Sequence, residues 1–421
     1  MARRYFGTDG VRGIVGRDLT LALVETLGRA FARWSDESSV LVGRDTRVSG
    51  PEIERALAAG LASGGSRVLL GGVLPTPAVA ILADESGAVV SASHNPAEYN
   101  GVKFFASGTK LTDDEEESVE RLLDQAGRDG GSIEHVDGLA DRYGDLIARR
   151  FGSNLGGLRV VLDCANGALS HIAPRVFRRL GADVIAVAAE ADGKLINDGC
   201  GATDLSLLAR AVPAHEASLG IAFDGDGDRM LAVDAAGREV DGDQILAILA
   251  LHLGVDLVAV TSMTNLGFHG LMSRRGVRVI TTDVGDRYVL EALRREGGRL
   301  GGEQSGHILW LDGHVTGDGL AAALLLCGVL VDSGESLEQA AAAMPRWPQV
   351  KQNVPVRTKE LTPALQARVD EVNAGLDGRG RLLVRPSGTE SVVRVLAEAE
   401  IEEEAARLCA SMAILVKQEL G

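Results

Sequence analysis

The sequence predicts an α/β protein with three α/β domains, built on mixed, mainly parallel sheets, and a smaller C-terminal α+β domain. Two observations support this fold class. Strand-like apolar runs alternate with helix-like amphipathic stretches, and such alternation implies crossover connections between parallel strands. The pattern also restarts near Leu158 and near Asp243, and it changes character after residue 346. These changes predict domains at residues 1–152, 153–242, 243–346 and 347–421.

The first domain is expected to alternate short strands and helices. Pro51 lies near the start of a stretch with helical spacing, a place that proline favours. The polar, acidic stretch from Thr112 to Gly156 is expected to end the domain with helices and a linker. The other expected elements are a strand at 40–42, a helix at 51–63, a strand at 67–70, a helix at 76–85 and a strand at 88–91.

The second and third domains repeat the alternation. The second is expected to hold strands at 158–164, 183–189 and 219–223, with helices at 171–181 and at 203–217, the latter interrupted by Pro213. The third is expected to hold helices at 243–254, 267–276 and 286–297, with strands at 256–262, 278–282 and 299–302. The apolar stretch 320–331 is too short to span a bilayer and is typical of a buried helix.

The last domain has a different order of elements. A helix at 362–376 is followed by two short β runs around RPSGTE and by a final helix from Glu402 to Glu419. Three glutamates begin this final helix and Lys417 lies near its end, as the helix dipole favours.

Composition restricts the function classes. The formal net charge of the 421-residue chain is −16, so its long-range field repels nucleic acid and anionic membranes. A small anionic substrate is still compatible, provided that cations gather in a cleft. The four cysteines form no CxxC pair, and no apolar segment follows the two N-terminal arginines. We therefore expect a soluble, cytoplasmic protein with reduced thiols.

The first loop that could support chemistry is SASHNP, residues 91–96, which follows a predicted buried strand. Ser93 could be an exposed nucleophile held in a rigid turn. Taken alone, the motif is more typical of an ordinary Ser/Asn/Pro turn. A serine-hydrolase triad is a weak competitor, because no GxSxG elbow is present and no acid is paired with His94.

The second loop is DGDGDR, residues 224–229, directly after the predicted strand at 219–223. Asp224, Asp226 and Asp228 alternate with glycines, so their carboxylates can converge on one hard cation. An EF-hand is excluded because its sixth and twelfth positions would be Arg229 and Ala235. Three carboxylates without a cation would repel one another, and an adjacent arginine suggests phosphate chemistry. The loop therefore predicts a Mg²⁺ site.

Two further loops are weaker signals on their own. In GGEQSGH, residues 301–307, Glu303 and Ser305 could bind sugar hydroxyls and His307 could move a proton. In RPSGTE, residues 385–390, an arginine, two hydroxyls and a glycine could hold a phosphate, although a hairpin turn is equally compatible; these residues are Arg385, Ser387, Gly388 and Thr389. Neither a GxxxxGK[ST] nor a GxGxxG motif occurs. The combination predicts phosphoryl transfer on a sugar without nucleotide machinery.

The four loops, in this order, resemble the α-D-phosphohexomutase superfamily, and within it the phosphoglucosamine mutases. The resemblance covers essentially the whole chain and extends to YFGTDGVRG, VGRDTRVSG, VLPTPAVA, SASHNPAEYNGVKFF, DCANGA, VGDRYV and GEQSGH. Gln304 in the third loop is similar to phosphoglucosamine mutases, whereas phosphomannomutases more often have Met and many phosphoglucomutases have Glu. The chain is somewhat shorter than many relatives.

The resemblance implies four domains around a central cleft, each contributing one loop. Ser93 would be phosphorylated, and the three aspartates would hold one Mg²⁺ together with an oxygen of that phosphoserine. Arg229 would lie near the phosphate. Around the reacting hydroxyl the resemblance places Arg12, Lys103 and His307, with the general base either Lys103 or His307. Glu303 and Ser305 would hold the sugar, and Arg385, Ser387, Gly388 and Thr389 would hold the phosphate that is not transferred.

The implied reaction interconverts glucosamine 6-phosphate and glucosamine 1-phosphate through glucosamine 1,6-bisphosphate, which would supply UDP-N-acetylglucosamine and cell-wall precursors. The partner would be a small phosphosugar, and a homodimer is plausible. Three alternatives stay open at this point: a phosphomannomutase/phosphoglucomutase with the same mechanism, a non-catalytic phosphosugar-binding regulator, and a metal-dependent phosphatase.

Overall fold

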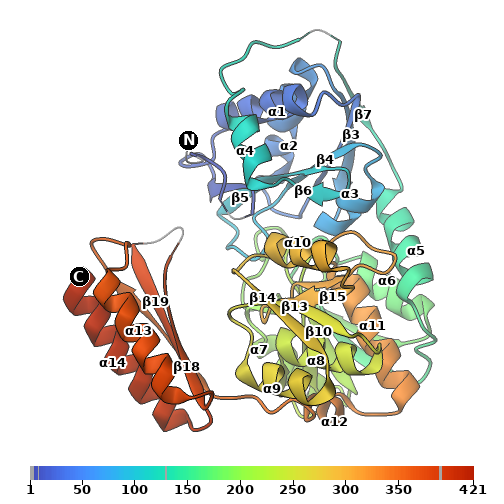
Figure 1. Ribbon diagram of the computed structural model, residues 1–421. Helices are drawn as coiled ribbons and strands as arrows, with labels where there is room; N and C mark the ends of the chain where they lie inside the picture. Colours follow the sequence, from blue (N-terminus) through green and yellow to red (C-terminus); the bar gives the residue numbers. More distant parts are fainter. Residues whose placement is uncertain (1–3, 8, 129, 388–390) are drawn as a thin grey trace. The chain divides into compact units, whose positions relative to one another are not determined.

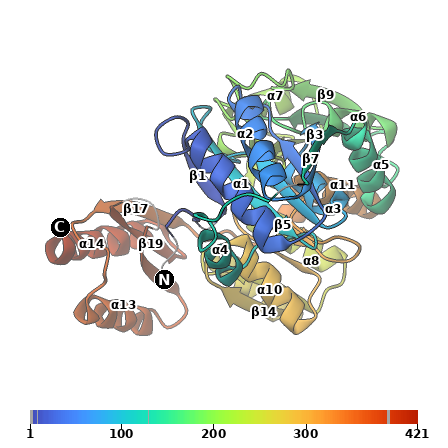
Figure 2. The ribbon, with the colours of Figure 1, turned by 90° about the horizontal axis from the view of Figure 1, so that it is seen from above.

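The computed structural model describes residues 4–7, 9–128, 130–387 and 391–421. The chain divides into two compact units, one of residues 1–263 and 276–343, the other of residues 264–275 and 344–421 (Figures 1 and 2). Within the described ranges, no helix is both long and apolar enough to cross a membrane.

The first sheet of the larger unit is mixed. Its central strands are parallel to one another, while β5 runs antiparallel to both β4 and β1. The strand order is β1 (Val11–Ile14), β5 (Tyr99–Ala106), β4 (Ser86–Val90), β2 (Ser39–Arg44), β3 (Arg67–Val73) and β7 (Ser132–His135), with β6 (Thr109–Lys110) paired to β5. The helices are α1 (Leu21–Ser35), α2 (Gly50–Ser63), α3 (Thr76–Leu82), α4 (Asp113–Glu120) and α5 (Leu139–Phe151).

Alternate residues of β2 pack against different helices. Val40 and Val42 belong to the apolar core under α1 and α2. Gly43 faces the other way, where a Cβ would lie 2.6 Å from a methyl carbon of Val79 in α3. Because side chains of a strand alternate between the two faces of a sheet, helices cover both faces, as the predicted α/β class requires.

The second sheet has the order β12 (Glu239–Val240), β11 (Met230–Asp234), β10 (Leu219–Phe223), β8 (Arg159–Asp163) and β9 (Asp183–Val187). The strands β8, β9 and β10 are parallel, and β11 returns antiparallel to β10. Its helical segments are α6 (Ile172–Arg179), the short 3₁₀ turn η1 (Gly201–Thr203) and α7 (Ser206–Ala214). The apolar face of α7 packs on Val161, Ala222 and Val233.

The third sheet has the order β14 (Arg278–Thr282), β13 (Leu257–Thr261), β15 (Leu300–Gly302) and β16 (Ile308–Trp310). The first three strands are parallel and β16 is antiparallel to β15. Helices α8 (Gly242–His252), α10 (Asp286–Glu296), α11 (Gly319–Ser333) and α12 (Leu337–Ala341) complete this part of the unit. The apolar helix α11 is largely buried, as its sequence predicts.

The smaller unit is an antiparallel sheet of order β17 (Gln349–Pro355), β19 (Val392–Ala399) and β18 (Gly380–Pro386). Helices α13 (Pro363–Leu376) and α14 (Glu402–Leu420) share one apolar core with this sheet. The unit also contains α9 (Leu266–Arg275), whose first backbone N–H donates to a Glu398 carboxylate oxygen at 2.7 Å.

The predicted fold class is confirmed. Most of the strands that sequence reasoning did not anticipate are antiparallel to a neighbour. They are β1, β5, β6, β11, β12, β16 and β17, together with the parallel strand β7 inside the stretch expected to hold helices and a linker. The helix expected at 203–217 is shorter, and α7 ends one residue after Pro213.

Candidate active site

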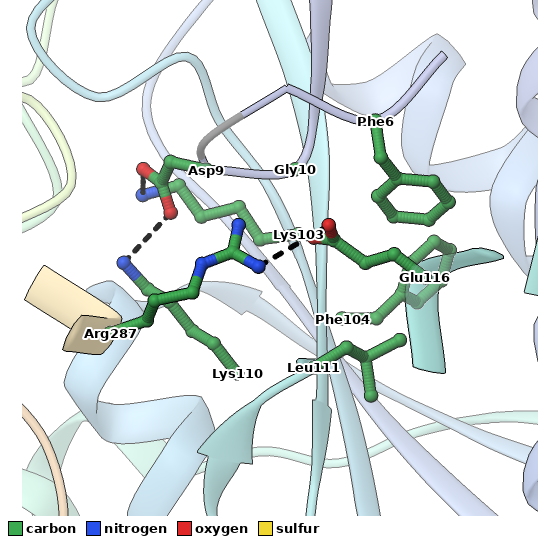
Figure 3. A pocket seen from close by; sticks show the side chains of 9 residues that line it. All are labelled: Phe6, Asp9, Gly10, Lys103, Phe104, Lys110, Leu111, Glu116 and Arg287. Carbon is green, nitrogen blue, oxygen red and sulfur yellow. Dashed lines mark hydrogen bonds and ion pairs between the residues drawn. The ribbon is translucent and has the colours of Figure 1, made fainter. Parts of the chain in front are cut away.

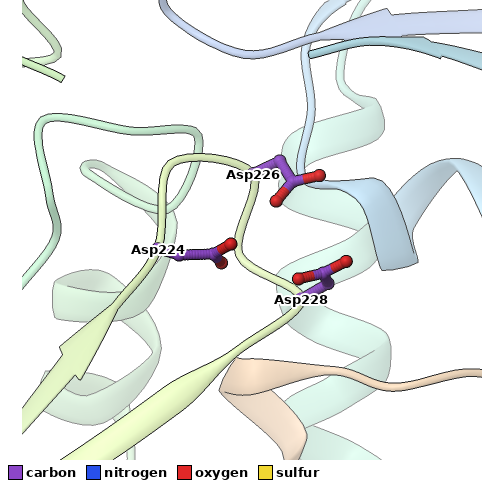
Figure 4. Close-up of side chains that lie close together, drawn as sticks. All are labelled: Asp224, Asp226 and Asp228. Carbon is purple, nitrogen blue, oxygen red and sulfur yellow. The ribbon is translucent and has the colours of Figure 1, made fainter. Parts of the chain in front are cut away.

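The loop between β10 and β11 gathers three carboxylates. Asp224, Asp226 and Asp228 are each at most 2% exposed, and one oxygen from each lies within 4.8 Å of the others (Figure 4). Gly227 adopts a left-handed backbone with φ of 72°, which bends the loop tightly. Atom Oδ1 of Asp226 and Oδ1 of Asp228 have no hydrogen-bond partner among the described residues. Buried unpartnered carboxylate oxygens of this kind fit a hard divalent cation such as Mg²⁺.

The three carboxylates are electrostatically unequal. Burial, together with the negative charges of Asp226 and Asp228, raises the pKa of Asp224 well above its ordinary range. Burial would also raise the pKa of Asp228, but the cations Lys103, His307 and Lys110 outweigh it and hold that pKa well below its ordinary range. A cation in the loop would relieve the repulsion that Asp224 experiences.

Ser93 follows β4 and lies directly against this loop. Its Oγ donates to Oδ2 of Asp224 at 2.6 Å, and the side chain is 1% exposed. Its backbone is left-handed, with φ of 51°, although it is not a glycine. The Ser93 N–H donates to Oγ of Ser91 at 2.8 Å, and that hydroxyl donates to Oδ2 of Asp45 at 2.6 Å. The strained backbone is therefore fixed by buried hydrogen bonds.

A buried arginine holds the serine loop. The Arg47 guanidinium, fully buried, pairs with Asp45 at 2.9 Å. It donates to the backbone carbonyls of Ser93 at 3.0 Å and Asn95 at 2.7 Å, and also to those of Pro96 and Tyr99. Its planar fork of donors suits this role, because several carbonyl oxygens converge on one cation.

Lys103, on β5, lies among three carboxylates. Its Nζ is 2.8 Å from Asp226, 3.4 Å from Asp228 and 2.9 Å from Asp9. Asp9 in turn pairs with Lys110 at 2.7 Å, and Figure 3 shows its carboxylate between the two lysine ammonium groups. Burial lowers the pKa of Lys103, but the carboxylates outweigh it and raise that pKa overall, so the side chain is held as a cation.

His307 closes a ring of alternating charges. Its Nδ1 is 3.7 Å from Oδ1 of Asp228, and its Nε2 is 3.3 Å from Oδ2 of Asp286. Asp286 pairs with Lys110 at 2.7 Å. The ring therefore runs through Lys103, Asp9, Lys110, Asp286, His307 and Asp228. Burial opposes a charged imidazole, yet Asp286 and Asp228 together raise the pKa of His307 above its ordinary value.

Two arginines lie near the serine and its neighbour. Arg12 donates to the carbonyl of Ala92 at 3.3 Å and pairs with Asp9. Arg229 lies 3.1 Å from Nδ1 of His94 through its Nη1 atom. Burial, followed by the charges of Arg229 and Arg12, lowers the pKa of His94 to about 3. His94 is thus a neutral imidazole at neutral pH.

The third loop, residues 301–307, begins at the end of β15, and its candidate sugar-binding residues differ in solvent exposure. Glu303 is buried, whereas Ser305 is exposed. Burial lowers the pKa of the Arg229 guanidinium, but the negative charges of Asp228, Asp224 and Glu303 outweigh burial and raise that pKa. Glu303 therefore lies close enough to Arg229 to interact with its charge. Gln304 donates to Oδ2 of Asp243 at 3.2 Å.

The fourth loop belongs to the smaller unit and is described by itself. Ser387 is buried; its hydroxyl accepts from Arg394 at 3.4 Å and its carbonyl from Lys359 at 3.0 Å. Arg385 is paired across the sheet with Arg394. Two members of the predicted phosphate loop, Gly388 and Thr389, lie outside the described residues.

Within the larger unit, the structure brings nearly all of the predicted residues together, namely Ser93, Asp224, Asp226, Asp228, Lys103, His307, Arg12, Arg229 and Glu303. Sequence reasoning missed Asp9, Lys110, Asp286 and Thr76, whose Oγ1 donates to Asp226 at 2.5 Å. Asp9, Thr76 and Asp286 lie within the stretches YFGTDGVRG, VLPTPAVA and VGDRYV that already stood out. No sequence signal marked Lys110.

Family models match nearly the whole chain. The matching models are those of phosphoglucomutase/phosphomannomutase α/β/α domain I at residues 3–129, domain II at 137–237, domain III at 241–347 and the C-terminal domain at 350–415.

Curated sequences and solved structures agree with these matches. The chain is 48% identical to a phosphoglucosamine mutase of Pelotomaculum thermopropionicum, over 93% of this chain and 94% of the relative. It is 49% identical to a phosphoglucosamine mutase of Frankia alni, over 99% of each. A phosphoglucomutase/phosphomannomutase family protein of Burkholderia thailandensis has the same fold, with a TM-score of 0.84 at 24% identity, over 98% of this chain and 97% of the other.

Proposed function

The chain belongs to the phosphoglucomutase/phosphomannomutase family, and from that premise we propose that it is a phosphoglucosamine mutase. It would interconvert glucosamine 6-phosphate and glucosamine 1-phosphate. Two curated relatives of nearly equal length, each almost half identical to this chain, have this name.

One observation supports the proposal above the others. The hydroxyl of Ser93 donates to Asp224 at 2.6 Å, and Asp224 belongs to a buried carboxylate triad in which two oxygens lack hydrogen-bond partners among the residues that the structure describes. A nucleophilic hydroxyl beside a hard-cation site is what phosphoryl transfer through a phosphoserine requires.

The proposed reaction has two transfers. The 1-hydroxyl of glucosamine 6-phosphate attacks the phosphorus of phosphoserine-93, the bond from phosphorus to the serine oxygen breaks, and glucosamine 1,6-bisphosphate forms. The intermediate then reverses its orientation. Oγ of Ser93 attacks the 6-phosphoryl group, the bond to the sugar oxygen breaks, and glucosamine 1-phosphate departs. Each hydroxyl loses its proton as it attacks, and the departing oxygen gains one.

Asp224, Asp226 and Asp228 would hold one Mg²⁺ together with an oxygen of the phosphoserine. When bound, this ion would neutralise charge on the phosphoryl oxygens, which is most of what such a transfer needs. Arg229 would add a positive charge from the protein side.

His307 is the better candidate for the proton acceptor. The ideal base has a pKa near the working pH. The pKa of His307 is raised from 6.5, whereas that of Lys103 is raised further from an already high 10.5. We therefore assign Lys103 and Arg12 to charge stabilisation and His307 to proton transfer.

Substrate binding would be divided between the third and fourth loops. Glu303 and Ser305 would bind the sugar ring. Arg385, Ser387, Gly388 and Thr389 would bind the phosphate that is not being transferred.

A turnover assay tests the proposal. With Mg²⁺ and a trace of bisphosphate, glucosamine 6-phosphate should be converted faster than mannose or glucose 6-phosphate, without steady release of inorganic phosphate.

Ser93→Ala should lose on the order of 10³-fold or more in kcat, and its intact mass should lack the phosphate seen in the unaltered protein. Ser66→Ala removes a hydroxyl of similar burial, which donates to the Glu37 carbonyl just before β3 begins, and should retain activity. Phosphate still present on Ser93→Ala would disprove the assignment.

Three organisational features complete the proposal. The functional domains are 1–152, 153–242, 243–346 and 347–421. A homodimer is proposed, and light scattering would test it. A cytoplasmic location is proposed, with support from four free cysteine thiols, all buried.

A further inference from the structure

A buried hydrogen-bond network lies beside the candidate active site but contains none of its residues. Tyr143, His314 and Asp318 are 0%, 6% and 2% exposed. The Tyr143 hydroxyl lies 2.9 Å from both carboxylate oxygens of Asp318, and Nε2 of His314 lies 2.9 Å from Oδ2. Oδ1 of Asp318 also accepts the Ala321 N–H at 3.0 Å, so Asp318 caps helix α11.

The tautomer of His314 follows from its partners. Its Nδ1 lies 2.8 Å from the backbone nitrogen of Val315 and 3.3 Å from that of Thr316. Backbone N–H groups can only donate, so Nδ1 accepts and Nε2 carries the proton that is donated to Asp318. Every polar atom of the imidazole is thereby used inside the network.

The segment that contains His314 and Asp318 contacts the candidate active site through two glycines, Gly317 and Gly319. A Cβ on Gly317 would lie 2.0 Å from Nε2 of His307, so the backbone at Gly317 sets the position of that ring. The Gly319 N–H donates to the Gly227 carbonyl at 3.0 Å, and a Cβ there would lie 2.5 Å from the Arg229 carbonyl. The segment therefore contacts both His307 and the metal loop.

Helix α5 also contacts this segment. In addition to the Tyr143 hydrogen bond, Arg150 donates to the Gly313 carbonyl at 2.8 Å. The ring of Phe151 stacks on that of His314 at 5.6 Å between centroids. Three side chains of one helix thus fix a segment that lies more than 160 residues away in sequence.

We propose that Tyr143, His314 and Asp318 are positioning residues. Through Gly317 and Gly319 they fix the position of His307 relative to the metal loop. In this role they would act on the reaction only through the segment that they fix. The proposal rests on the mutase function for its kinetic part, but its metal-binding part can be tested without turnover.

Tyr143→Phe is the sharpest test, because it removes one hydroxyl and keeps the ring. We expect a folded protein with kcat lowered on the order of ten-fold, since small misplacements at a reacting centre are costly. KM for glucosamine 6-phosphate should stay within about two-fold, since the substrate contacts remain. Mg²⁺ binding, measured by calorimetry, should weaken several-fold. Val212→Ala, at a buried position of α7 itself, serves as a stability control and should lower the melting temperature without changing kcat or Mg²⁺ affinity.

The outcomes are distinguishable. An unaltered kcat and an unaltered Mg²⁺ affinity in Tyr143→Phe would overturn the proposal, and so would equal losses in Val212→Ala. If the unaltered protein binds Mg²⁺ but converts no phosphosugar, the mutase function fails, and weaker Mg²⁺ binding in Tyr143→Phe would still support the network. If Tyr143→Phe does not fold, His314→Asn is the alternative test. Its amide oxygen can still accept the backbone hydrogen bonds that Nδ1 accepts, but its shorter side chain cannot donate to Asp318, so the same losses in kcat and Mg²⁺ affinity are expected.

Discussion

Single residues at this site have their properties set by neighbours far away in the sequence. Lys103 and His307 are both buried and both lie against carboxylates, yet they are suited to different work. The pKa of Lys103 is raised from the already high value of 10.5, so the side chain stays a cation, whereas the pKa of His307 is raised from an ordinary value of 6.5. Burial alone would have lowered both.

The pH dependence of kcat should distinguish the two residues. A base must be neutral to accept a proton, so kcat should fall as the pH drops through the raised pKa of His307. In His307→Gln we expect kcat to be lowered on the order of 10²-fold and this acidic limb to disappear. In Lys103→Gln the limb should persist at a lower overall rate. A limb that survives in His307→Gln and vanishes in Lys103→Gln would reverse the assignment.

At the scale of elements, the serine loop and the metal loop meet without room for another carbon. A Cβ on Gly225 would lie 2.7 Å from the Ser93 carbonyl oxygen and 2.8 Å from a methyl carbon of Ile196. This close approach allows Ser93 and Asp224, from different sheets, to form one hydrogen bond.

Gly225→Ala should therefore separate the two loops. We expect a loss of about 1–3 kcal/mol in the free energy of unfolding from overpacking, and kcat lowered on the order of ten-fold from misplacement of Ser93. Chemical denaturation and steady-state kinetics would measure the two effects. Gly375→Ala is the control, because a Cβ there meets nothing within 4 Å and the position lies in helix α13. Full activity in Gly225→Ala would show that the loops can move apart freely.

The metal loop should bind Mg²⁺ in a pH-dependent way. Asp224 has a raised pKa, so its proton competes with the metal as the pH falls. Mg²⁺ affinity, measured by calorimetry over a range of pH values, should decrease as the pH is lowered. Asp224→Asn should bind weakly across this range with a flatter dependence. An affinity that does not change with pH in the unaltered protein would mean that Asp224 is fully ionised before the metal binds.

At the scale of the whole molecule, what could be predicted depended on how close the interacting residues lie in the sequence. Asp224, Asp226 and Asp228 share one loop, so their spacing alone indicated a metal site. The roles of Asp9, Lys110 and Asp286 could be recognised only from the structure, because the partners of each residue lie many positions away in the sequence. Parallel strands were predicted from their alternation with helices, whereas antiparallel returns such as β5 and β11 had no crossover pattern to mark them.

The smaller unit supplies the prediction that belongs to this scale. If Arg385 binds the phosphate that is not transferred, it must serve either end of the bisphosphate. Arg385→Ala should then raise KM for glucosamine 6-phosphate and glucosamine 1-phosphate alike, roughly ten-fold each, as loss of a charged hydrogen bond would. Glu371→Ala, an exposed position on α13, is the control in the same unit. A KM raised for one phosphosugar alone would contradict the role.

The backbone at Ser93 also limits how this protein can evolve. Its φ of 51° is tolerated by an unbranched side chain but is strongly disfavoured for a β-branched one. Threonine has the same hydroxyl and is commonly interchanged with serine in other proteins, yet here its extra methyl group would have to enter a left-handed, buried turn. Substitution at this position is therefore disfavoured in two ways. The other residues that fit the left-handed turn lack the hydroxyl, and threonine, which keeps the hydroxyl, does not fit the turn.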